Sequence, residues 1–65
     1  MKAQEIFEAD PELHRVATLE FMKIQDEVGM DHDRVEQAKA AFLGEIEKFR
    51  TVENAAKVAR EAVGL

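Results

Sequence analysis

The chain has 65 residues, a net charge of −5 and no cysteine, and these properties exclude several kinds of protein. Disulfide scaffolds and thiolate metal sites both need cysteine, so neither can form. A chain of this length buries only about 60% of the surface that it exposes when unfolded, so a lone core is marginally stable. Because small domains often gain stability by oligomerising, we expect a single helical domain over residues 1–65 that self-associates.

The N-terminal segment and the distribution of charge indicate a cytoplasmic protein that avoids polyanions. No apolar run approaches the ~20 residues of a membrane span, and MKAQEIFEAD has too many acids for a secretory signal. Residues 1–28 hold seven acidic side chains against three basic ones, whereas residues 45–65 hold four of each. Since the acidic half would repel nucleic acid at long range, we do not expect nucleic acid as a partner.

A short helical segment and a long amphipathic helix are the first predicted elements. Residues 3–9 form the short segment. Asp10 followed by Pro11 then marks a helix start, because Asp caps free N–H groups and Pro lacks an N–H that would go unused there. Apolar residues recur every three or four positions as far as Gly29, which predicts a helix over residues 11–28 that ends at the glycine.

The next helix can begin at Asp31 or at Asp33, and the pattern favours Asp33. With Asp33 as the N-cap, Glu36 lies three residues later and completes an Asp version of the capping box. Gly44 falls inside this helix, where glycine costs about 1 kcal/mol relative to alanine. It indicates a close helix contact, a bend or a tolerated surface position. We also expect helical ion pairs three or four residues apart: Glu36–Lys39, Glu47–Arg50 and Glu53–Lys57.

Residues 33–63 fit two architectures. Apolar side chains recur at strict seven-residue intervals, at Val35, Phe42, Phe49, Ala56 and Val63. Read literally, they predict one helix of about 30 residues, about 45 Å long, and hence a long helical hairpin. Thr51, however, precedes an acidic and alanine-rich stretch that is typical of a new helix start. We favour the break, and therefore an all-α small helical bundle in which a short N-terminal helix precedes three helices.

Residues 21–40 resemble the helix-turn-helix motif of bacterial regulators, in which a glycine turn joins two packed helices. The resemblance rests on the spacing of Ile24, Val28, Gly29, Met30, Val35 and Ala38. It departs from the family at Gln25, where a small residue is usual. Residues 31–36 carry three acids and one base, which would place carboxylates against phosphates. We expect an architectural corner, with a helix-turn-helix-like DNA-binding regulator as the alternative.

No residue pattern predicts catalysis, a cofactor or a metal ion. The chain has no serine, cysteine or tyrosine, and its only side-chain hydroxyls are those of Thr18 and Thr51. Residues 31–36 offer carboxylates and an imidazole, but a metal site needs three or four convergent ligands. A chain of this size also leaves little room for a ligand pocket of about 300 Å³ or more. We therefore expect a protein that is not an enzyme.

Four phenylalanines, three methionines and many aliphatic side chains exceed what one narrow helical seam needs. If some of them form an exposed apolar patch, that patch marks a site for a partner. The candidate partner-binding residues are Leu19, Met22, Leu43, Ile46, Phe49 and Val52.

The predicted function is that of a small acidic protein–protein interaction module, a regulator, adaptor or small subunit. Its expected partner is itself, as a homodimer, or another protein. A second alternative, after DNA binding, is an acidic mimic of nucleic acid that binds a basic protein. This mimicry requires one continuous acidic surface made by Glu5, Glu8, Glu12, Glu20, Asp26 and Glu27.

Overall fold

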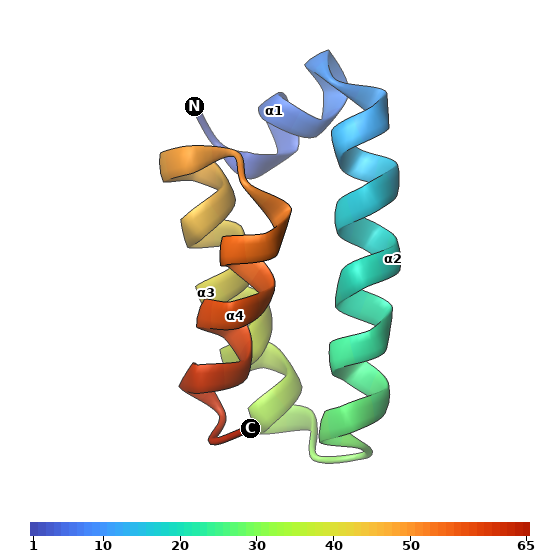
Figure 1. Cartoon of the computed structure of the whole chain (residues 1–65), viewed down its shortest axis with the longest axis vertical. Helices are drawn as coiled ribbons and strands as arrows, with labels where there is room; N and C mark the ends of the chain where they lie inside the picture. The colour runs from blue at the N-terminus through green and yellow to red at the C-terminus, as the bar shows by residue number, and fades with distance from the viewer.

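Four α-helices and no strand make up the fold, which a computed structural model describes for residues 1–65 (Figure 1). The helices are α1 (Ala3–Ala9), α2 (Pro11–Val28), α3 (His32–Phe49) and α4 (Val52–Ala62). The three longer helices run alternately down and up the long axis, which measures 31 Å, and α1 lies across the end where α2 begins (Figure 1). The predicted all-α bundle of a short helix plus three helices is confirmed.

The signals that frame α2 act as expected. The Oδ1 atom of Asp10 accepts a hydrogen bond from the backbone N–H of Leu13 at 3.1 Å, and Pro11 is the first helical residue. Gly29 follows the last turn with a φ of 80°, and its N–H donates to the carbonyl of Gln25 at 2.9 Å. A φ of 80° combined with a ψ of −142° is readily adopted only by glycine, which explains why the helix ends there.

Asp31, not Asp33, caps α3, so the choice between the two aspartates was wrong. Asp31 has extended backbone angles, and its Oδ1 accepts from the N–H of Arg34 at 3.2 Å. Only the residue just before the first helical one can reach that N–H group. The turn consists of Gly29 and Met30, and Asp31 follows directly as the cap. Helix α3 therefore begins at His32, and Asp33 lies within its first turn.

The break that we favoured near Thr51 is present, which rules out the long helical hairpin. Helix α3 ends at Phe49, and Arg50 adopts a left-handed conformation with a φ of 54°. Thr51 occupies the N-cap position of α4, but its hydroxyl donates to the carbonyl of Phe49 at 3.1 Å and caps nothing. The chain therefore reverses in two residues, and α4 packs back against the other helices.

The hydrophobic core fills the space between the three longer helices. Its largest fully buried side chains are those of Ile24, Phe42 and Ile46. The ring of Phe21 meets that of Phe42 edge-on, with centroids 5.5 Å apart. Helix α4 contributes mainly small side chains, which allow it to approach α3 closely: Ala55, Ala56 and Ala59.

Candidate interaction surfaces

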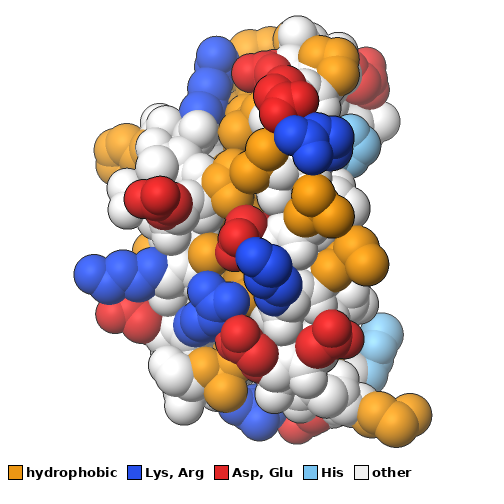
Figure 2. Space-filling view, turned by 45° about the vertical axis from the view of Figure 1, so that its right-hand side comes forward, with side chains coloured by type: hydrophobic (Ala, Val, Ile, Leu, Met, Phe, Trp, Pro, Cys, Tyr) orange, Lys and Arg blue, Asp and Glu red, His pale blue; other side chains and the backbone are white.

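The side of α2 that faces away from the bundle carries two large exposed apolar side chains. Leu19 is 50% exposed and Met22 is 55% exposed, although the opposite side of the same helix is buried in the core. Figure 2 shows hydrophobic side chains on this part of the molecule, with charged side chains above and below them. We call this stripe the outer face of α2, and it consists of Arg15, Leu19, Met22 and Asp26.

A second surface is an open groove bounded by α1, α2 and α3. It consists of two adjoining hollows of about 190 and 470 Å³. The rings of Phe7 and His14 stack with centroids 4.9 Å apart in its wall. The larger hollow exceeds the pocket volume that we expected from so short a chain, because the short α1 leaves space beside the two long helices. Four residues line both hollows: Phe7, His14, Lys39 and Leu43.

The corner between α3 and α4 exposes one aromatic side chain. Phe49 is 64% exposed, even though it continues the seven-residue row of Val35 and Phe42. Phe49 is the last residue of α3 before the reversal at Arg50, so the apolar row leaves the core at the end of the helix. Val52, on the other side of the corner, is half-buried and packs against the core.

The six candidate partner-binding residues therefore fall into three groups. Ile46 is fully buried and cannot touch a partner in this fold, so its assignment to a surface was wrong. Leu43 and Val52 are half-buried against the core, and Leu43 shares the groove with Met22. The well-exposed members of the set are Leu19, Met22 and Phe49. That these residues bind a partner stays a prediction.

Sequence reasoning did not group two charged residues, Arg15 and Asp26, with the apolar residues of the outer face. Arg15 and Asp26 stand four residues before Leu19 and four residues after Met22, so all four positions share one side of α2. Both charged side chains are exposed. The signal was the same helical spacing that identifies buried stripes, but we had applied it to apolar residues only.

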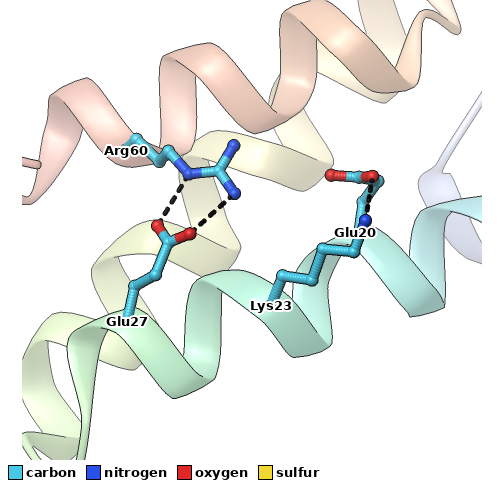
Figure 3. Close-up of polar contacts among 4 residues, drawn as sticks. All are labelled: Glu20, Lys23, Glu27 and Arg60. Atoms are coloured by element: carbon cyan, nitrogen blue, oxygen red, sulfur yellow. Dashed lines mark hydrogen bonds and ion pairs between the residues drawn. The ribbon is translucent and has the colours of Figure 1, made fainter.

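A bidentate ion pair closes part of the seam between α2 and α4. Arg60 donates to the two carboxylate oxygens of Glu27, from Nε at 2.7 Å and from Nη2 at 3.0 Å (Figure 3). The hydrogen bonds from Arg60 hold the pKa of Glu27 below its ordinary value, and the proximity of its positive charge acts in the same direction. This contact joins two residues that are 33 positions apart in sequence and so links α2 to α4.

The remaining ion pairs lie within α2 and differ from the expected ones. Glu12 accepts from Arg15 at 2.6 Å, and this hydrogen bond lowers the pKa of Glu12. The Nζ atom of Lys23 lies 3.1 Å from Oε1 of Glu20 (Figure 3). The three pairs that we expected on α3 and α4 do not form: Glu36–Lys39, Glu47–Arg50 and Glu53–Lys57.

The corner between α2 and α3 joins two helices that run antiparallel. The two helices of a helix-turn-helix cross at about 90–120°, whereas α2 and α3 run antiparallel along the same axis (Figure 1). Arg34, the base nearest the start of α3, donates to the carbonyl of Val63. Gln37 donates to the carbonyl of Ala62 at 3.0 Å. Both side chains thus hold the end of α4.

The acidic side chains do not form an unbroken surface. Of the six acids that nucleic-acid mimicry requires, Glu12, Glu20 and Glu27 are each paired with a basic side chain. Figure 2 shows basic side chains among the acidic ones on this face. A basic partner would therefore have to compete with the protein's own Arg and Lys residues.

The chain was compared with protein families, with curated proteins and with solved structures, and none of these comparisons found a match.

Within the structure, no group of three or more histidine, aspartate or glutamate side chains could hold a metal ion. None of the four helices combines the length and the hydropathy that crossing a membrane requires.

Proposed function

We propose that this chain is a small protein–protein interaction module that binds a second copy of itself through the outer face of α2. The observation that carries the proposal is the exposure of Leu19 and Met22, 50% and 55% respectively, on a helix whose other side already serves the core. The two side chains are three residues apart and hence neighbours on the helix surface. Removing both from water would favour association.

The size of the chain supports self-association. A domain of 65 residues has a small core, and oligomerisation is one of the few sources of stability open to a chain without cysteine. The proposal includes a cytoplasmic location and a binding role in place of a catalytic one. The lack of serine, cysteine and tyrosine supports that role, because three of the side-chain types that act as nucleophiles are missing.

The interaction should be weak. Helix α2 has 18 residues and is therefore about 27 Å long and about 10 Å wide. A pair of such helices buries well under the roughly 1,200 Å² that marks the lower end of stable interfaces. Association must accordingly be sought up to about 1 mM protein, where a binding free energy of about 4 kcal/mol suffices.

Light scattering as a function of concentration tests the proposal. We expect the weight-average mass to rise from the 7.4 kDa of the monomer toward twice that value. The double variant L19S/M22S should stay monomeric. The matched control is F49S, because Phe49 is at least as exposed but lies at the corner between α3 and α4, and this variant should still associate. A constant mass of 7.4 kDa for the unmodified chain would contradict the proposal.

A further inference from the structure

The outer face of α2 carries charges that are arranged symmetrically about its apolar centre. Arg15, Leu19, Met22 and Asp26 are spaced four, three and four residues apart. At roughly 100° per residue, all four lie within an arc of roughly 60°. This arc is opposite the buried side of the helix, and α2 stands at the edge of the bundle with no other helix outside it (Figure 1).

This arrangement is complementary to itself in one orientation only. If a second α2 lies antiparallel, with the two-fold axis between Glu20 and Phe21, Leu19 faces the partner's Met22 and Arg15 faces the partner's Asp26. Because a two-fold interface uses the same patch on both copies, each of these contacts occurs twice. A parallel pairing would instead bring like charges together, Arg15 against the partner's Arg15 and Asp26 against the partner's Asp26.

We propose that two copies of this chain pair as an antiparallel two-fold dimer through the outer face of α2. The apolar contacts lie at its centre, and the Arg15–Asp26 pairs lie at its two ends. This inference rests on the proposed function and adds to it the register and the orientation of the interface. The partner is a second copy because the four side chains, when one helix is reversed, place apolar against apolar and positive against negative side chains.

The charged ends of the interface are available for these contacts in the monomer. Asp26 is exposed and forms no ion pair. Arg15 pairs with Glu12, but it uses only Nε and Nη2 for that contact, and a guanidinium has five N–H donors. Since both side chains of the Glu12–Arg15 pair are exposed to solvent, the pair holds Arg15 only weakly.

The charge pairs should act mainly by selecting the orientation. A net charge of −5 on each copy opposes association at long range, but salt at physiological strength screens it beyond about 8 Å. At contact distance the Arg15–Asp26 pairs act directly, and such complementary pairs fix register more than they add affinity.

Charge reversal followed by mixing tests the inference. In a dimer of R15D two carboxylates meet at each end of the interface, and in a dimer of D26R two guanidinium groups meet there. Each variant alone should therefore dimerise about tenfold more weakly than the unmodified chain, because two exposed ion pairs are lost. An equimolar mixture of the two variants forms a heterodimer in which one end joins the two native side chains and the other end joins the two substituted ones, so both ends carry opposite charges. Its light-scattering mass should return to that of the unmodified chain at the same concentration.

K57D is the matched control for the charge reversal. Lys57 is exposed on α4, a helix that carries none of the four residues of the proposed interface, and its replacement changes the net charge by the same amount as R15D. We expect K57D to dimerise as the unmodified chain does, apart from the small effect of its added negative charge.

The outcomes separate the two proposals. If the unmodified chain dimerises but R15D is no weaker than K57D, the antiparallel interface is wrong and the self-binding module stands. If R15D and D26R are both weakened but their mixture does not recover, the register is wrong. If the unmodified chain stays at 7.4 kDa up to about 1 mM, the proposed function falls and the inference falls with it. Circular dichroism of each variant separates these results from loss of the fold.

Discussion

Replacing Gly44 by alanine should make the protein more stable. Gly44 lies inside α3, and a Cβ atom built on it meets no atom within 4 Å. The residue therefore serves neither a close helix contact nor a positive φ, and the reading of Gly44 as a tolerated position is the one that fits. Alanine is better than glycine in a helix interior by about 1 kcal/mol, so the free energy of unfolding of G44A should rise by about this amount. For a domain of this size, that corresponds to an increase in Tm of about 4–8 °C.

The same chemical change at Gly29 should have the opposite sign. Gly29 also has no neighbour within 4 Å of a built Cβ, but its φ of 80° and ψ of −142° belong to glycine alone. We expect G29A to lose about 1–3 kcal/mol because the backbone is strained. Urea and thermal unfolding followed by circular dichroism, at a concentration where the chain is monomeric, measure both variants. A destabilised G44A, or a G29A as stable as the unmodified chain, would refute this reasoning.

Three further predictions concern the cap, the core and the seam between helices. D31A should lower the free energy of unfolding by about 1 kcal/mol, and D33A by less than half as much, when urea unfolding compares them; equal losses would contradict the assignment of the cap. I46A should lose about 2–5 kcal/mol, much of the roughly 3–10 kcal/mol expected for 65 residues, and full helical signal at about 25 °C in mild urea would contradict its burial. Because the hydrogen bonds from Arg60 lower the pKa of Glu27 in the folded state, their contribution is present above the ordinary glutamate pKa of about 4.3 and disappears as the pH falls through the lower folded value. The Tm of the unmodified chain should therefore drop more on acidification than that of E27Q, and parallel pH profiles would show that the pair adds no stability.

The bounds of α2 and the break near Thr51 could be predicted because each depends on a few neighbouring residues. Asp10 and Gly29 act through their own backbone and side chains, wherever the rest of the chain lies. The cap of α3 was mispredicted because neighbouring residues alone do not distinguish the two candidates. Asp31 and Asp33 both offer a carboxylate, and Glu36 supported the second, but the length of the turn decides between them.

The surface could not be predicted in the same way, because exposure depends on where α4 folds back. Ile46 and Phe49 both lie on apolar rows of α3, yet the reversal at Arg50 leaves the first in the core and the second in solvent. Likewise, the spacing rule for ion pairs three or four residues apart within one helix does not predict the Glu27–Arg60 pair. These residues meet only because α2 and α4 pack side by side (Figure 3).

The most direct measurement of self-association through α2 is paramagnetic relaxation between two copies. Because the chain has no cysteine, the variant E12C takes a single spin label, and it leaves Arg15 free for the partner's Asp26. When this copy is mixed with an isotope-labelled unmodified copy, the antiparallel dimer predicts broadening of the amide signals around Gly29 of the labelled copy. Broadening centred on residue 12, or on α4, or none at about 1 mM, would contradict the account.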